Sequence, residues 1–395
     1  MSEQFAGNPE LYPEDYTIPD DSGPPTSVMH NVAHEALGHR TAWLKQRVVA
    51  LQTLTKRVEA LNWLRRTTSI DDLEFAVYDH GTRGWLAGGD QRNLRSSTDF
   101  GVTWSNTNLL SLVGGDLDPL TDGAFDGLGK AVIAAKSKDV FVFSTSWARK
   151  AVHASSEDGA DGAIVYDPVH SLWCAAAEFN ADGVLIATAS DPAGTWTARS
   201  RPSGMDQGTV PGGVAMAVHK VDGRIVLATT HSDGTMLLIT STDGGVTWSA
   251  VTSVALGLAS VLNPILGVSV SVNESTGEWI AIATKRSNTD SGFAASAVLR
   301  STNGTSWTKV AGLTSSLLSH AAPTVSAWVS VARTGGKAEV VLSEDGGATW
   351  LRTGMVLEGS EHRGAYAGGG ALIALTDEYA YTSLRTGMPE LGALT

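Results

Sequence analysis

The chain repeats one short polar phrase that ends in tryptophan, and this repeat limits the possible folds more than any other feature. Three full copies span Ser97–Trp104, Ser241–Trp248 and Ser343–Trp350. Two weaker copies span Ser190–Trp196 and Ser301–Trp307. Self-similarity at this spacing indicates one supersecondary unit that is stacked several times.

The residue types of the phrase predict a tight turn followed by an apolar anchor. A short acidic or amide side chain can accept bonds from nearby backbone N–H groups, and glycine supplies positive φ. The tryptophan is a large apolar body that needs a surface to cover. The turn residues are Asp99, Gly101 and Trp104; Asp191, Gly194 and Trp196; Asp243, Gly245 and Trp248; Asn303 and Trp307; and Asp345, Gly347 and Trp350. We expect them to fold the turn rather than to contact a ligand.

The spacing of the tryptophans predicts a mainly β fold made of four-stranded units. Successive intervals from Trp104 to Trp350 are 92, 52, 59 and 43 residues, and a propeller blade takes roughly 40–50 residues. The first interval leaves room for a degenerate unit around Val140–Trp147. A last unit without tryptophan fits Ala371–Leu375 and Tyr379–Leu384. The sequence therefore predicts a seven-bladed β-propeller over 74–387, with six blades as the alternative.

Composition narrows the classes of function. Asp and Glu outnumber Lys and Arg by 41 to 28, and no basic stripe occurs, so we do not expect nucleic acid as a partner. The single cysteine, Cys174, excludes an intrachain disulfide and reads as a buried thiol. No apolar run is long enough for a membrane span, and the N-terminus lacks a signal peptide, so we expect synthesis in a cytoplasm.

The residues before the propeller predict two further segments. Residues 1–27 are rich in proline and carboxylates and indicate an extended anchoring arm. Residues 28–68 predict a helix that oligomerises as a coiled coil, although packing on the propeller is the alternative. Its apolar stripe includes Leu44, Val48, Leu51, Val58 and Leu61. Residues 388–395 are expected to form a C-terminal tail.

The repeated phrase resembles the Asp-box, or bacterial neuraminidase repeat, of sialidase-like propellers. The resemblance covers roughly 75–387, and in that family the turn lies on the outer edge of a blade. Such propellers include sialidases, sortilin-type receptors, photosystem assembly factors and phage proteins, so the resemblance implies a fold and leaves function open.

The N-terminal region is similar to the start of tailed-phage tail-fibre and related virion proteins. The similarity is carried by Pro13–Asp20, Asn31–Leu37 and Arg40–Lys45. It implies an arm that docks on other tail, baseplate or capsid proteins, a helix that forms a homotrimer, and a displayed propeller. The expected function is that of a virion component that binds a host-surface glycan, with no enzymatic activity and no cofactor. A capsid-attached decoration or head fibre is the alternative within this class.

Two groups of residues in the sequence are candidate metal sites. His34 and His39 are five residues apart and cannot share one metal on a helix face, so no metal is expected there. Asp116, Asp118 and Asp122 form a weak calcium candidate because the EF-hand register fails.

A sialidase-like glycoside hydrolase is the enzymatic alternative. Its Arg-Ile-Pro signature is absent, although basic and phenolic side chains are available in the blades. These residues are Arg300, Arg333, Arg363 and Tyr366.

Overall fold

Short antiparallel strands account for nearly all regular structure in the computed structural model of the 395-residue chain. The described residues are 63–66, 73–89, 93–113, 118–153, 162–179, 183–205, 209–231, 233–258, 265–285, 295–314, 317–324, 327–334, 337–359, 362–368, 371–376 and 379–384. The chain divides into two compact units, Met1–Glu59 and Ala60–Thr395, and every described residue belongs to the second. The predicted arm (1–27), the helix up to residue 62 with its apolar stripe, and the tail (388–395) lie outside the described residues.

Each of the first five sheets is a four-stranded antiparallel meander in chain order. Blade 1 contains β2 (Leu73–Asp79), β3 (Gly84–Gly89), β4 (Asn93–Ser97) and β5 (Ser105–Asn108). Blade 2 contains β6 (Leu120–Phe125), β7 (Ala131–Ala135), β8 (Asp139–Phe143) and β9 (Trp147–Ala151). Blade 3 contains β10 (Gly162–Asp167), β11 (Leu172–Phe179), β12 (Gly183–Ala189) and β13 (Thr197–Arg199). Blade 4 contains β14 (Thr209–His219), β15 (Arg224–His231), β16 (Thr235–Ser241) and β17 (Thr252–Ala255). Blade 5 contains β18 (Ile265–Val272), β19 (Trp279–Lys285), β20 (Ala295–Ser301) and β21 (Thr308–Thr314).

The last two sheets depart from this pattern. Blade 6 contains β24 (Trp328–Thr334), β25 (Lys337–Ser343) and β26 (Leu351–Leu357), and its inner strand is split into β22 (Leu317–Leu318) and β23 (Ala322–Pro323). Blade 7 contains β27 (His362–Gly368), β28 (Ala371–Thr376), β29 (Ala380–Leu384) and, from the other end of the chain, β1 (Trp63–Arg65). A short helix, α2 (Leu109–Val113), joins blades 1 and 2.

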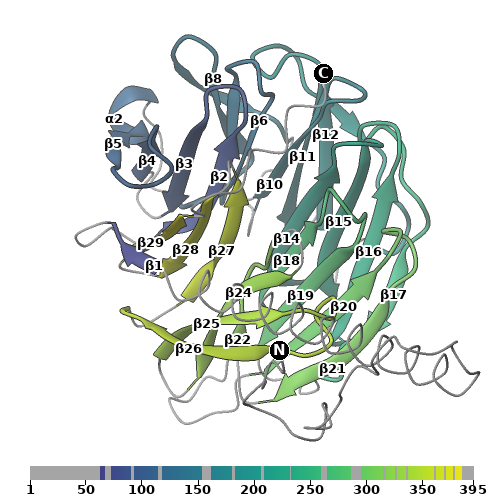
Figure 1. The fold of residues 1–395 in the computed structure, drawn as a ribbon. Helices are drawn as coiled ribbons and strands as arrows, with labels where there is room; N and C mark the ends of the chain where they lie inside the picture. The colour runs from purple at the N-terminus through teal and green to yellow at the C-terminus, as the bar shows by residue number, and fades with distance from the viewer. Residues whose placement is uncertain are drawn as a thin grey trace, which may run out of the picture. The chain divides into compact units, whose positions relative to one another are not determined.

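The seven sheets follow one another around a central axis, and the first strand of each blade is innermost. In Figure 1 the colour passes around the ring from blue through teal and green to yellow, and the yellow strands β27–β29 lie beside blade 1. The fold is therefore a seven-bladed β-propeller. This confirms seven blades over the six-bladed alternative, and it confirms a mainly β chain.

The ring is closed by a strand from the N-terminal side. β1 pairs antiparallel with β29, with Trp63 opposite Ser383 and Arg65 opposite Tyr381. For residues 63–65 the predicted helix is thus wrong, and the propeller begins before residue 74. The free edge of β29 offers unpaired backbone groups to this segment, and such tertiary pairing overrides a local helical pattern.

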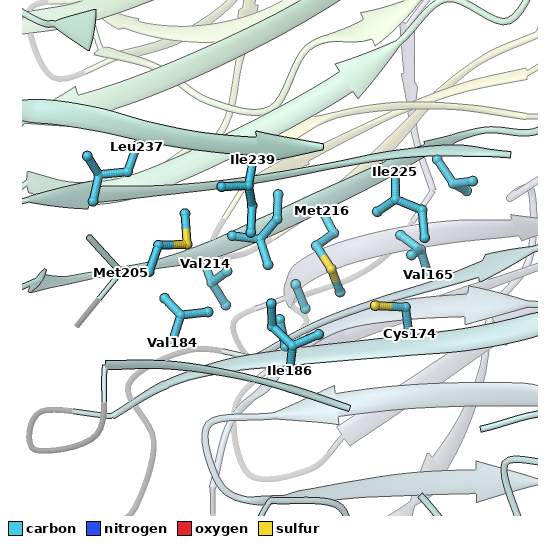
Figure 2. Packing of buried hydrophobic residues seen from close by; sticks show 14 residues of the cluster. Val165, Cys174, Val184, Ile186, Met205, Val214, Met216, Ile225, Leu237 and Ile239 are labelled. Carbon is cyan, nitrogen blue, oxygen red and sulfur yellow. The ribbon is translucent and has the colours of Figure 1, made fainter. Parts of the chain in front are cut away.

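Apolar layers lie between neighbouring blades. Figure 2 shows the layer between blades 3 and 4, where Cys174 and Ile186 meet Met216 and Ile225. The tryptophans of the repeated turns pack on such layers: Trp104, Trp147, Trp196, Trp248, Trp307 and Trp350 each contact one. Trp63 of β1 is buried in the layer between blades 6 and 7. It supplies an aromatic side chain to the blade whose own turn lacks one.

The repeated turns share one set of hydrogen bonds. In the first copy, the Asp99 carboxylate accepts bonds from the Ser97 hydroxyl (2.8 Å), the Thr103 amide (2.8 Å) and the Thr103 hydroxyl (2.6 Å). The Trp104 indole donates to the Gly101 carbonyl at 2.9 Å. The copies at Asp243 and Asp345 have the same pattern. The carboxylate therefore bonds to a residue four positions further along the chain and closes the turn.

Chain direction defines two ends of the central channel. Because every blade is a meander, all inner strands begin at one end, here called the entry end. The turn between the third and fourth strands, where the repeated phrase lies, is at the opposite end, here called the turn end. As a fourth strand, β1 begins at the turn end, so Trp63 lies there.

Candidate binding site in the central channel

The axis of the propeller holds a cavity of about 760 Å³, lined by residues from the inner strands of all seven blades. This volume is within the usual range for sites of small molecules. The lining is divided between polar groups and small residues. Small residues come mainly from blades 4 and 5 and include Gly213, Ala215, Ala217, Gly267, Ser269 and Ser271. Charged and phenolic side chains come from every blade, and those of blades 7, 1 and 2 are described next.

Arg363, Glu74 and Tyr366 form a linked group at the entry end. The Arg363 guanidinium lies 3.3 Å from the Glu74 carboxylate, so an ion pair joins blades 7 and 1. The Tyr366 hydroxyl donates to the backbone carbonyl of Glu74 at 2.9 Å. Burial, followed by the negative charges of Asp122 and Glu74, raises the pKa of Tyr366 well above its usual value. The phenol therefore stays protonated and acts as a donor.

His320 lies beside this group in the interrupted inner strand of blade 6. Its ring stacks on Tyr366 with centroids 4.6 Å apart and planes 11° from parallel. Nδ1 is 2.9 Å from the Ala365 carbonyl, and Nε2 is 3.0 Å from the Ser271 hydroxyl. Burial lowers the pKa of His320, so the neutral ring donates from Nδ1 and accepts at Nε2. The ring thus ties blades 5, 6 and 7 together around the channel.

Asp122 lies at the junction of blades 2 and 3. One carboxylate oxygen accepts the Ile164 amide at 3.0 Å, and the other accepts the Gly123 amide at 2.8 Å. Burial raises the pKa of Asp122 to about 7, against the opposing effect of these two bonds. Near neutral pH the group therefore exchanges between an acceptor and a protonated donor.

Some of the candidate residues identified in the sequence line the channel, and others lie away from it. Arg333, Arg363, Tyr366 and Asp122 line the channel together. Arg300 does not, because its guanidinium lies at the turn end, 2.7 Å from the Glu278 carboxylate. The repeated turns also lie away from the channel, on the preceding blade: for example, the Thr382 hydroxyl of blade 7 donates to Gly101.

The calcium candidate is not brought together by the described residues. Asp116 lies outside them, and Asp122 bonds to backbone amides of two inner strands. Among the described residues, no group of three His, Cys, Asp or Glu side chains could hold a metal ion. Within the same residues, no helix is long and apolar enough to cross a membrane.

Two important channel residues, Glu74 and His320, were missed by sequence reasoning. Neither lies in a repeated phrase, and their partners are 292 and 49 positions away for the Tyr366–Glu74 and Ser271–His320 bonds. The available signal was positional: Glu74, Asp122 and Arg363 each stand in the second or third position of an inner strand.

The arrangement is suited to holding a polar ligand. It offers a cation, carboxyl groups, a phenol and hydroxyls around a cavity that is lined on one side by small residues. Of the three tyrosines that line the cavity, Tyr366 is protonated and already donates to a backbone carbonyl. The neutral His320 ring has both nitrogens engaged. Neither of these two groups has the activation that a covalent nucleophile requires.

Comparison with known proteins supports the fold. No protein-family model matches the chain, and no curated protein matches it. Among solved structures, "YCF48 bound to D1 peptide" is similar with a TM-score of 0.53 at 13% identity, over 82% of this chain and 94% of that one. The β-propeller domain of Myceliophteria thermophila Cps50 (Swd1) gives a TM-score of 0.49 at 12% identity, over 81% and 99%. SapL1 lectin in complex with alpha methyl fucoside gives 0.45 at 10% identity, over 76% and 98%. At such identities the first likeness shows the propeller fold alone.

Proposed function

We propose that this chain is a non-enzymatic binding protein that presents the entry end of its propeller to a polar ligand, a glycan of a host-cell surface. The observation that carries the proposal is the channel at the entry end, where the Arg363–Glu74 pair, Asp122 and Tyr366 surround one cavity. Hydroxyl-rich ligands suit such a site because carboxyl groups, guanidinium groups and phenols can each bond to sugar hydroxyls.

The proposal includes a place on a tailed-phage or phage-like particle, as a tail fibre, tail spike or baseplate-attached protein. It is supported by the resemblance of Pro13–Asp20, Asn31–Leu37 and Arg40–Lys45 to the start of such proteins. A trimer formed by residues before 63 would gain avidity for a repeated surface ligand.

We further propose that the repeated turns are Asp-boxes. The shared bonds from Asp99, Asp243 and Asp345 to the following threonines support this assignment. In this interpretation the turns stabilise contacts between blades, and ligand recognition is left to the channel.

A sialidase-like hydrolase is the second candidate, because arginines, a tyrosine and carboxyl groups meet in the channel. The contacts of Tyr366 argue against it. Its hydroxyl donates to a backbone carbonyl at 2.9 Å, and its raised pKa is the reverse of what a nucleophilic phenol needs. Glu74, the carboxylate nearest in the network, is paired with Arg363.

The test uses the full-length protein, labelled and applied to a panel of purified bacterial surface polysaccharides. We expect binding to at least one polysaccharide, reduced at least about tenfold by Arg363→Gln, because that change removes a charged donor from the channel. Arg352→Gln, on the exposed outer strand β26, should bind like the unmodified protein.

Two outcomes would overturn the proposal. One is equal binding by the Arg363 and Arg352 variants, which would move the ligand site away from the channel. The other is steady release of sugar from a bound polysaccharide or a fluorogenic sialoside, abolished by Tyr366→Phe, which would make the protein an enzyme.

A further inference from the structure

The inner strand of blade 6 is interrupted between β22 and β23, and the residues between them also bond to blade 7. β22 and β23 both pair with β24, but Ser319–Ala321 between them does not continue the ladder. His320 instead forms an isolated parallel bridge with Gly364, in which the Ala365 amide donates to the His320 carbonyl at 3.0 Å. The His320 side chain adds a bond to the Ala365 carbonyl at 2.9 Å. The same stretch also keeps bonds to β24, because the Ser319 amide donates to the Val331 carbonyl at 3.3 Å and the Ser330 hydroxyl donates to the Ser319 carbonyl at 3.2 Å. It is thus bonded both to its own sheet and to blade 7.

The channel cavity has a recess between blades 5 and 6. The channel cavity reaches past the inner strands to Ile282 and Thr284 of β19 and to Arg333 at the end of β24. A Cβ atom placed on Gly267, at the edge of β18, would meet nothing within 4 Å. The Thr284 hydroxyl donates to the Leu318 carbonyl and so joins blades 5 and 6 at this point. The part of the channel cavity lined by these residues is here called the recess.

Arg333 is the cation of this recess. Its side chain is partly buried, and no described carboxylate or carbonyl accepts a bond from its guanidinium. The neighbouring hydroxyls of Thr284 and Ser319 already donate, to Leu318 and Val331. By contrast, the other channel arginine, Arg363, is paired with Glu74. A partly desolvated guanidinium with five donors and no counter-charge among the described residues is a site for an oxyanion.

We propose that the recess between blades 5 and 6 is a ligand subsite in which Arg333 binds the oxyanion, carboxylate or phosphate, of an acidic sugar. Ser269 and Gly267 line the channel beside this subsite. The inference rests on the proposed function, since it assigns a charge to the glycan that the channel takes.

Isothermal titration of the full-length protein with three matched probes tests the charge. Glucuronate and glucose 6-phosphate carry a carboxylate and a phosphate on the same ring, and glucose carries neither. We expect heat of binding for at least one of the acidic sugars and at least about tenfold weaker binding of glucose, because a charge-assisted bond is lost. The stronger of the two acidic probes identifies the oxyanion. Equal affinity for glucose, or no binding of either acidic probe, would overturn the subsite.

Two variants locate the binding. Arg333→Gln should weaken the acidic probe at least about tenfold toward the level of glucose, and Arg352→Gln should leave it unchanged. Gly267→Leu places a side chain in the open recess without touching Arg333 and should block the probe as well. Thermal unfolding of each variant confirms that it is folded. If polysaccharide binding depends on Arg363 while both recess variants bind the acidic probe normally, the subsite is wrong and the proposed function stands. If Arg363→Gln instead binds polysaccharide as well as Arg352→Gln does, the ligand site is not in the channel and the proposed function is wrong.

Discussion

Asp122 is a residue whose charge state should couple folding to pH. Its pKa is raised to about 7 by burial, whereas in the unfolded chain it ionises near its usual value of 3.8. Because the unfolded chain releases the proton first, this residue makes stability fall as pH rises from about 4 to about 7, with no further change above. We expect Asp122→Asn to remove that decline.

The measurement is the midpoint of thermal unfolding at several pH values between 4 and 8, for the protein and the variant. The amide cannot accept from both Ile164 and Gly123, so the variant is expected to be less stable at low pH. The quantity to compare is therefore the slope of the unfolding midpoint against pH. Burial lowers the pKa of His320, which acts in the opposite direction, but that contribution is present in both proteins and cancels in the difference. Parallel curves would show that Asp122 is ionised throughout.

Gly245 is a residue at which both conformation and space exclude a side chain. Its φ is +86°, and a Cβ atom would lie 2.5 Å from the Cys174 sulfur of the preceding blade. Gly245→Ala should cost about 2–4 kcal/mol, from left-handed strain and overpacking together. Gly234→Ala is the matched control, because its φ is +82° with nothing within 4 Å. Urea unfolding should show the larger loss for Gly245.

The reactivity of the Cys174 thiol tests the same contact between Gly245 and Cys174. Its side chain is buried, and burial raises the pKa of its thiol to about 12. We expect no reaction with a disulfide reagent at pH 8 in the native protein and full reaction after unfolding. In Gly245→Ala the rate should rise, since the layer between blades 3 and 4 opens more often. A native thiol that reacts at once would contradict the buried position.

The role of a residue could be predicted from the sequence where its hydrogen-bond partners are close to it in the chain. Asp99, Asp243 and Asp345 bond within four residues of themselves, so their pattern in the sequence predicts a turn directly. The channel is different. The partners of Glu74 and His320 come from other blades, and nothing in the sequence says which inner strands meet. Asp122 was considered as a metal ligand for the same reason: its neighbours in sequence are acidic, whereas its hydrogen-bond partner across the channel is Ile164.

At the scale of elements, β1 shows how tertiary pairing overrides a local pattern. Residues 28–68 have apolar residues at helical steps, and the last turn of that pattern is the strand Trp63–Arg65. Arg65 pairs with Glu358 and lies 4.9 Å from the ring centre of Tyr379, so each of these contacts depends on the C-terminal blade. After the second full turn phrase, which ends at Trp248, the fourth strand of blade 4 begins only at Thr252.

The two neighbours at the start of β1 give a matched test of this closure. Trp63 is 4% exposed and packs in the layer between blades 6 and 7, whereas Leu64 is 54% exposed. Trp63→Ala should lower the free energy of unfolding by about 3–5 kcal/mol. Leu64→Ala should change it by no more than about 0.5 kcal/mol. Similar losses in urea unfolding would mean that β1 does not close the ring.

At the scale of the whole molecule, the repeat predicted the architecture well because a propeller is a sum of similar units. The spacing of five tryptophans was enough to place seven blades, including the degenerate blade 2. The order of the last blade was not predictable from spacing, since one of its strands lies more than 300 residues away from the others. Each end of the ring therefore depends on the other, and folding of the last blade requires the chain on both sides.

This dependence separates two truncations that the sequence alone treats as equivalent. The chain from Ala60 keeps β1, whereas the chain from Thr67 lacks it. If residues before 60 oligomerise as proposed, light scattering should give a multimer for the full chain and a folded monomer for the chain from Ala60. The chain from Thr67 should be less stable than the chain from Ala60 by several kcal/mol, because it loses Trp63 and exposes β29 as an edge. A full-length monomer would refute the oligomerising segment without affecting the ring closure. Equal stability of the two truncations would refute the closure without affecting the oligomer.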